Sequence, residues 1–378
     1  MGQLSKVLLA SITVSLIPVQ RAGALVPEAE LKPYVSVGRK LDPFSPEGGV
    51  MALLPLSERE LAVGTWQAGV WALNVEQSHE GRRARRILPP GTGAHALTLL
   101  PSAHLVAGEG PFVRLVNTSA GLPSSSGCLI ATPPAVNTLL SQGDSLFIGT
   151  DFGLYILNNS MLEEAVHACD GMPQYWGGLF YGNSSVSTTR PSALPDRSIH
   201  ALLHLSDACN TSGMDPCVAA GTDQGLFLLG QRGPLAWLAV SFHVASLLKL
   251  PSGGLAVGTL DGVLLFRSED LRPGGKAYAR LAKGSAVWAM QLLASGELLL
   301  GTSAWNEPVD RGALLFSLEE SNSSELDSAP SAVLASGSIV QALSVLSTGV
   351  VAVGGPSGVS LYDINARDLH GSSLLASV

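Results

Sequence analysis

Histidines and acidic residues occur in similar local settings along the chain, where they could carry out acid–base chemistry. His95 and His200 each follow the first apolar residue of a strand-like run. Four acidic residues lie in or beside glycine-containing turns: Glu109, Asp151, Asp223 and Asp261. An imidazole and a carboxylate can act as general acid and base only when they lie within hydrogen-bond reach. Convergence of these groups would make the protein a lyase or hydrolase, which is the alternative interpretation of the sequence.

The cysteines favour disulfides over metal binding. The chain has four, at Cys128, Cys169, Cys209 and Cys217. No Cys-x-x-Cys pair and no histidine pair at metal-ligand spacing is present, so the sequence predicts no metal site and identifies no cofactor. Four cysteines allow three pairings, and we favour Cys209–Cys217 with Cys128–Cys169.

A repeat must position these residues. Each copy has an apolar run, Gly-Thr, a short gap, a second glycine and another apolar run. The seven copies cover Leu61–Leu73, Leu105–Val116, Leu146–Leu157, Val218–Leu229, Leu255–Phe266, Leu298–Phe316 and Val351–Tyr362. The second and seventh are degenerate, with Glu109-Gly110 and Gly355-Pro356 in place of the usual turn. A repeat of this size is one supersecondary unit that stacks on its neighbours.

Each copy contains three short runs typical of β-strands, such as Val244–Leu250, Leu255–Gly258 and Val263–Phe266. We expect Gly258 and Gly262 to adopt positive φ in the hairpin turn. We also expect Asp151, Asp223 and Asp261 to bond locally to the backbone of their turns.

A fourth strand must come from the variable stretches, so the sequence predicts an all-β, seven-bladed β-propeller of four-stranded antiparallel blades. Either Tyr34–Val37 or Ser373–Val378 would supply the last outer strand. The repeat resembles that of two-component-regulator propellers, a ligand-sensing family of periplasmic and extracellular proteins. This resemblance implies a β-propeller that binds a ligand, and it extends from about Val50 to Ile364.

Composition excludes some partners. The net charge of −8 argues against nucleic acid, which requires a basic face. The basic run Arg82–Arg86 lies between two repeats and is interpreted as a solvated outer strand or loop. Its Arg-x-Arg-Arg pattern also fits a processing site, but cleavage there would cut the repeat array.

Residues 1–24 fit a signal peptide, with Lys6, an apolar stretch at Val7–Val19 and the small residues Ala22-Gly23-Ala24. Residues 25–49 form an N-terminal segment that could close the last blade, and residues 50–378 form the propeller. No other segment is long and apolar enough to span a bilayer, so no membrane segment is expected after cleavage. We therefore expect a secreted or secretory-pathway glycoprotein. Its sequons are at Asn117, Asn158, Asn183, Asn210 and Asn322.

The sequons indicate which face of the propeller is free. Asn117, Asn158 and Asn322 follow third strands, and Asn210 lies between a first and a second strand, so all four fall on one face. Asn183 lies in the long gap Asn159–Arg197, which is either an interaction loop or an outer strand with a serine-rich tail. Glycans are bulky, so the opposite face, with the Gly-Thr turns and the channel mouth, is predicted to bind an extracellular protein, a glycan or a small ligand.

Candidate ligand-binding residues on that face fall into three groups. The turns contribute Trp66, Asp151, Asp223 and Asp261. The longest turn, in the sixth copy, contributes Trp305, Asn306, Glu307, Asp310 and Arg311. The second position of each inner strand contributes Met51, His95, Asn137, His200, Ala245, Trp288 and Gln341. This last set either rings the channel mouth or makes hydrogen bonds between blades.

Overall fold

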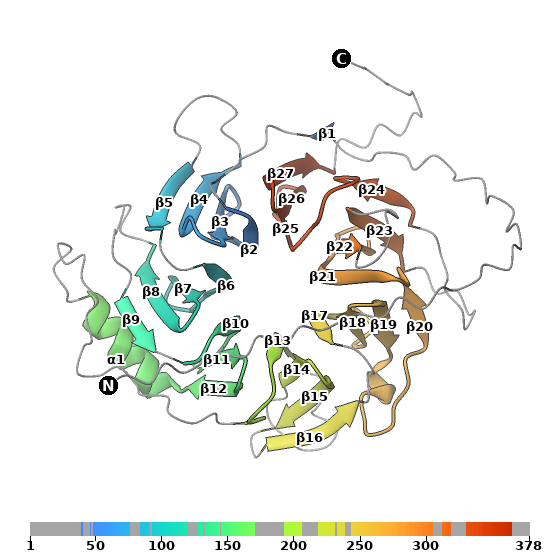
Figure 1. The fold of residues 1–378 in the computed structure, drawn as a ribbon, viewed down its shortest axis with the longest axis horizontal. Coiled ribbons are helices and arrows are strands. Elements are labelled where there is room, and N and C mark those ends of the chain that lie inside the picture. The colour runs from blue at the N-terminus through green and yellow to red at the C-terminus, as the bar shows by residue number, and fades with distance from the viewer. Residues whose placement is uncertain are drawn as a thin grey trace, which may run out of the picture. The chain divides into compact units, whose positions relative to one another are not determined.

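The computed structural model describes residues 39–40, 46, 48–75, 84–90, 93–118, 128–131, 133–143, 145–170, 193–205, 218–230, 233–238, 243–304, 312–318 and 330–364. The chain divides into two units, and the second, residues 34–378, holds every described element. Within this unit, seven antiparallel sheets are arranged radially as the blades of a β-propeller (Figure 1). This confirms the predicted fold class. No helix among the described residues has the length and apolarity needed to cross a membrane.

The first four blades follow one another along the chain. Blade 1 has β2 (Val50–Pro55), β3 (Glu60–Thr65), β4 (Val70–Asn74) and β5 (Ala84–Leu88). Blade 2 has β6 (Ala94–Leu99), β7 (His104–Glu109), β8 (Phe112–Asn117) and β9 (Cys128–Ala131). Blade 3 has β10 (Val136–Gln142), β11 (Ser145–Thr150) and β12 (Gly153–Leu157). Blade 4 has β13 (Ile199–His204), β14 (Val218–Thr222), β15 (Gly225–Gly230) and β16 (Gly233–Leu238).

The last three blades complete the ring, and the N-terminal side supplies its final strand. Blade 5 has β17 (Val244–Lys249), β18 (Leu255–Thr259), β19 (Gly262–Phe266) and β20 (Ala279–Leu281), with a 3₁₀ turn at Ser268–Asp270. Blade 6 has β21 (Ser285–Leu292), β22 (Glu297–Ala304), β23 (Ala313–Ser317) and β24 (Ala332–Leu334). Blade 7 has β25 (Ala342–Val345), β26 (Val350–Gly355), β27 (Gly358–Asp363) and β1 (Arg39–Lys40). β1 pairs antiparallel with β27 and lies outermost in this sheet.

The repeat glycine is required by contact between blades. A Cβ on Gly108 would lie 2.5 Å from Val136 Cγ1, and one on Gly221 would lie 2.5 Å from Val244 Cγ1. A Cβ on Gly354 would lie 2.6 Å from Val50 Cγ1, so the same contact joins the last blade to the first. The absence of a side chain therefore lets each blade approach the next.

The prediction that Gly258 adopts positive φ was wrong. Only the second glycine of that copy, Gly262, has positive φ, at 103°. A Cβ on Gly258 would instead lie 3.0 Å from Val287 O, in the next blade. The two glycines of one copy thus serve different needs, close packing for the first and turn geometry for the second.

The threonine of the repeat fixes the turn. Thr150, Thr222 and Thr259 are buried, and each donates its hydroxyl proton to the carbonyl of the glycine three residues later at 2.8–2.9 Å. The same hydroxyl oxygens accept the backbone N–H groups of Phe152, Gln224 and Asp261. The local turn contact predicted for the aspartates is therefore made by threonine, and that prediction was wrong.

Blade 3 departs from the regular pattern. Its sheet has three strands, and Leu154 of β12 forms an isolated bridge with Ala193 where a fourth strand would lie. The chain between them begins with helix α1 (Asn159–Asp170), which the sequence analysis did not predict. Asn158 caps this helix, because its Oδ1 accepts the N–H of Met161 at 3.1 Å.

The basic run lies partly in the outer strand β5, as the simpler interpretation expected. Arg85 forms an ion pair with Glu60 at 3.1 Å, and the Arg86 guanidinium lies 4.5 Å from the centroid of the Trp71 ring. Both arginines thus have partners in blade 1. Residues 82 and 83 lie outside the described residues.

Candidate functional site

The inner strands carry a β-bulge at one repeated position. Pairing between first and second strands skips one residue in six blades. The skipped residues are Met51, His95, Asn137, His200, Ala245 and Trp288. These are six of the seven residues predicted at the inner-strand position, and all are half-buried. A bulge removes its residue from the ladder and re-aims the side chain, and bulges are common beside functional sites.

Aromatic contacts link these residues across blades. The imidazoles of His200 and His243 lie against each other, with centroids 3.9 Å apart and ring planes tilted by 35°. His243 in turn meets Trp288 edge-on at 6.5 Å, and Trp288 Nε1 donates to Ser303 Oγ at 2.7 Å. His200, His243 and Trp288 come from blades 4, 5 and 6, so the contacts extend from blade to blade around the ring.

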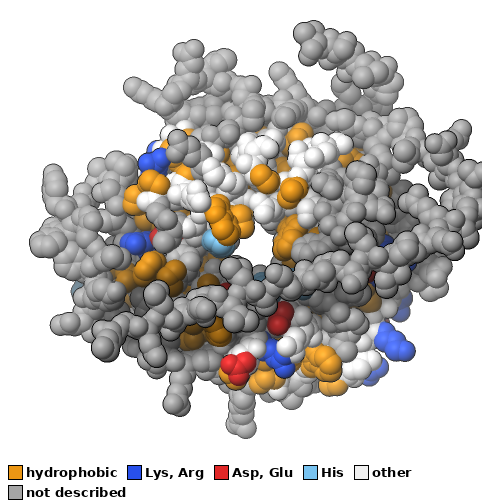
Figure 2. All heavy atoms as spheres, viewed as in Figure 1, with side chains coloured by type: hydrophobic (Ala, Val, Ile, Leu, Met, Phe, Trp, Pro, Cys, Tyr) orange, Lys and Arg blue, Asp and Glu red, His pale blue; other side chains and the backbone are white. Residues whose placement is uncertain are grey.

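A polar cluster continues this arrangement toward blade 3. Asn137 Nδ2 donates to Asp151 Oδ1 at 2.8 Å, and Ser198 Oγ donates to the same oxygen at 3.1 Å. Asp151 and Asp223 are exposed. Further round, His95 lies against Trp66 with ring centroids 4.8 Å apart. We call His95, Asn137, Asp151, Ser198, His200, Asp223, His243 and Trp288 the channel-mouth arc. A space-filling view shows an opening at the centre of the ring with a histidine and hydrophobic side chains at its edge (Figure 2).

The histidines of the arc favour the neutral form. Burial and the neighbouring His243 lower the pKa of His200 to about 4, although Asp151 and Asp223 oppose the shift. Burial also lowers the pKa of His95, with Asp151 opposing, and that of His243, with Asp223 opposing. Burial therefore outweighs the nearby carboxylates at all three sites.

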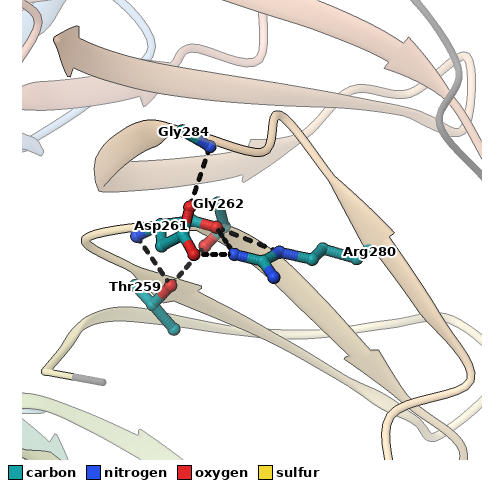
Figure 3. A network of polar contacts seen from close by, with 5 residues as sticks. All are labelled: Thr259, Asp261, Gly262, Arg280 and Gly284. Atoms are coloured by element: carbon teal, nitrogen blue, oxygen red, sulfur yellow. Dashed lines mark hydrogen bonds and ion pairs between the residues drawn. The ribbon is translucent and has the colours of Figure 1, made fainter. Parts of the chain in front are cut away.

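Two predicted acidic groups are structural instead. Asp261 forms an ion pair with Arg280 and accepts the N–H of Gly284 at 2.9 Å, so it ties its turn to the strand and loop that follow (Figure 3). Glu109 is buried and forms an ion pair with Arg114 at 2.7 Å. Each carboxylate is thus neutralised by an arginine in this arrangement.

The exposed large hydrophobic residues gather on one face. This face, which we call the turn face, consists of the turns between second and third strands and the loops that enter first strands. Trp66 and Phe152 lie in such turns, and Ile339 lies in the loop entering β25. Trp237 donates Nε1–H to the carbonyl of Gln224, also in a turn. These four are the exposed large hydrophobic residues among the described residues.

The sequence prediction named five residues that the structure places on the turn face: His95, His200, Asp151, Asp223 and Trp66. Their role in ligand binding stays a prediction. The sequence prediction missed His243 and Ser198. Each residue directly precedes an inner strand, of blade 5 and blade 4 respectively, and this shared position could have identified them. Five predicted residues, Trp305, Asn306, Glu307, Asp310 and Arg311, lie outside the described residues.

The acid–base pair that the enzyme alternative requires is not formed within the described part of the chain. Neither His95 nor His200 makes a hydrogen bond to a carboxylate there. Their rings instead make tilted contacts with the rings of Trp66 and His243, respectively. No group of three potential metal ligands occurs among the described residues.

Comparisons with known proteins identify the fold. No family model matches the chain, and no curated protein matches it. Among solved structures, the chain is similar to the WD40 β-propeller domain of Doa1, with TM-score 0.62 and 12% identity over 86% of this chain and 95% of that one.

Two further similar structures are extracellular domains of two-component system proteins. One is the extracellular domain of a protein described as a hybrid two-component system from B. thetaiotaomicron, with TM-score 0.57, 17% identity and coverage of 87% of this chain. The other, from a second such protein of B. thetaiotaomicron, has TM-score 0.53, 13% identity and 88% coverage. The chain spans 40% and 42% of their lengths. These structures bear out the predicted resemblance at the level of the fold.

Proposed function

We propose that this protein is a secreted binding module that contacts an extracellular protein, glycan or small ligand through the turn face and the channel-mouth arc. The observation that supports this most strongly is the location of Trp66, Phe152, Trp237 and Ile339 on one face. Loops on a rigid scaffold commonly carry binding residues, and aromatic residues dominate contact energies. The half-buried polar groups of the arc would supply orientation at the centre.

The opposite face fits the glycan-bearing surface that the sequence predicts. Asn117 ends β8 and Asn158 follows β12, so both belong to connections on the side away from the turn face. Asn158 caps α1 through Oδ1, which leaves its Nδ2 free to carry a glycan. We propose glycans at both positions and at Asn183, Asn210 and Asn322, which lie outside the described residues. We also propose cleavage of a signal peptide at residues 1–24.

We propose the disulfide Cys128–Cys169 together with Cys209–Cys217. Cys128 is disulfide-bonded, and it packs with Met161, Ala165 and Val166 of α1 in one apolar cluster. Cys169 belongs to the same helix, α1. Cys209 and Cys217 lie outside the described residues.

The test of the binding function compares the two faces. Wild-type secreted protein would be used to capture a partner, and the affinity of the purified pair would then be measured. Trp66→Ala with Phe152→Ala should weaken binding at least tenfold without changing the melting temperature, because both side chains are exposed. Asn117→Gln with Asn158→Gln is the matched control on the opposite face. Loss of binding only in the control would contradict the proposed face.

A further inference from the structure

The acidic residues on the turn face divide into two kinds. Asp261 and Glu109 are neutralised by Arg280 and Arg114. Asp151 and Asp223 have no cationic partner among the described residues, although Arg197 and Lys283 lie in loops on the same face. The Asp223 carboxylate makes no hydrogen bond there either. Within the described part of the chain, two carboxylates near His200 therefore lack counter-ions.

The histidines between these carboxylates do not compensate their charge. Burial lowers the pKa of His95, His200 and His243, so at neutral pH the imidazoles carry no positive charge. The mouth therefore has negative charge together with neutral aromatic rings, including Trp66 beside His95 and Trp288 beside His243. Aromatic faces attract cations, most strongly when water is excluded.

One ring nitrogen of the arc also lacks a partner. His243 Nε2 is buried and has no hydrogen-bond partner among the described residues. A buried polar atom without a hydrogen bond is costly, so a rearrangement of this side chain on ligand binding would be favoured.

We propose that the channel-mouth arc binds a positively charged amine or guanidinium group, with Asp223 and Asp151 as its counter-ions beside the aromatic rings of the arc. The proposal rests on the binding function proposed above and specifies its ligand chemistry. The group would be either a free small molecule or the side chain of a lysine or arginine in a partner that also covers Trp66 and Phe152. Charge-assisted hydrogen bonds to the carboxylates would orient it.

The test is an NMR titration of the histidine Hε1 resonances at pH 7 with three probes. They are butylguanidinium chloride, the peptide acetyl-Leu-Arg-Leu-amide, and butanol as the uncharged control. Butylguanidinium or the arginine peptide should shift the His200 and His243 resonances saturably, and butanol should not. A tenfold or greater preference for the peptide indicates a protein source, and equal affinity indicates a small-molecule source.

Asp223→Asn should weaken binding of the cationic probe at least tenfold and make it less sensitive to salt. Asp270→Asn is the matched control, because it removes the same charge from a connection between third and fourth strands on the opposite face. Wild-type affinity in Asp223→Asn, equal shifts with butanol, or no saturable shift would overturn the inference. The comparison of the two faces with Trp66→Ala and Phe152→Ala does not depend on the cationic probes. Failure of the cation-binding inference can therefore be distinguished from failure of the proposed binding function.

Discussion

The imidazoles of His200 and His243 are in contact at a centroid separation of 3.9 Å, although the two residues belong to neighbouring blades. Two protonated rings at this distance would repel each other, and burial disfavours each charge separately. Protonation of both imidazoles should therefore destabilise this contact. The stability of this contact at the channel mouth should therefore depend on pH.

The first prediction concerns stability against pH. The pKa of His200 is about 4 in the folded protein, against 6.5 for an ordinary histidine. Between these values the unfolded state binds more protons, so the free energy of unfolding should fall as pH falls from 6.5 to 4. Because His200 is only half-buried, we expect its contribution to be on the order of 1 kcal/mol. Urea unfolding at several pH values measures it.

The matched variants for this experiment are His200→Gln and His167→Gln. The first removes the contacting pair and should flatten the dependence between pH 6.5 and 4. The second removes an exposed imidazole of α1, far from the pair, and should keep the wild-type slope. An unchanged slope in His200→Gln would show that the pair does not sense protons in the folded state.

The second prediction concerns packing between blades. A methyl group on Gly108 would meet Val136 Cγ1 at 2.5 Å, so Gly108→Ala should destabilise the protein by about 1–3 kcal/mol. Val136→Ala removes the clashing atom. The double variant should therefore lose less stability than the sum of the losses in the two single variants, by roughly 1 kcal/mol. Urea midpoints of the four proteins give this coupling.

Gly143→Ala is the control for this cycle. A Cβ at Gly143 would meet nothing within 4 Å, although its φ of 52° makes alanine unfavourable. Its loss of stability should be additive with that of Val136→Ala, because the two sites share no contact. If the stability losses of Gly108→Ala and Val136→Ala were additive, the neighbouring blade would accommodate the new methyl group without strain.

The fold could be predicted because the reasons for it recur in the sequence. Each Gly-Thr pair combines a glycine that a neighbouring blade approaches with a threonine that closes a turn, as at Gly221 and Thr222. The helix α1 was missed because it occurs once and interrupts the repeat. Its apolar spacing at Leu162, Ala165 and Val166 after a capping asparagine was the available signal.

The candidate site could be predicted only in part, for a related reason. The bulge residues share one position in each repeat, so His95 and His200 were found by alignment of the copies. Their chemistry depends on partners from elsewhere in the chain. Asp151 accepts a hydrogen bond from Ser198, and His200 lies against His243, and no local pattern relates these residues. Local pattern likewise could not separate Asp223, which has no cationic partner among the described residues, from Asp261, which has one.

The third prediction concerns the proposed disulfide. A peptide map of the unreduced protein should link Cys128 to Cys169, and Cys169→Ser should lower the free energy of unfolding by up to about 4 kcal/mol. In reducing buffer the wild type and the variant should have similar stabilities. Cys217→Ser is the control, because it should leave the Cys128 link intact. A map that joins Cys128 to Cys209 or Cys217 would refute this pairing.

The last prediction identifies the working face with a single glycan. The turn at Asp151–Gly153 is a poor place for a new sequon, because Gly153 has φ of 125° and a serine or threonine there would be strained. Lys283→Asn instead completes an Asn-Gly-Ser sequon with the native Gly284 and Ser285, in the exposed loop entering β21. A glycan on this loop should abolish partner binding and leave the melting temperature nearly unchanged. Lys283→Gln, which removes the charge without a sequon, should bind as the wild type does, and enzymatic removal of the new glycan should restore binding. If the glycosylated variant binds normally while changes at Asn117 or Asn158 abolish binding, the partner must contact the opposite face.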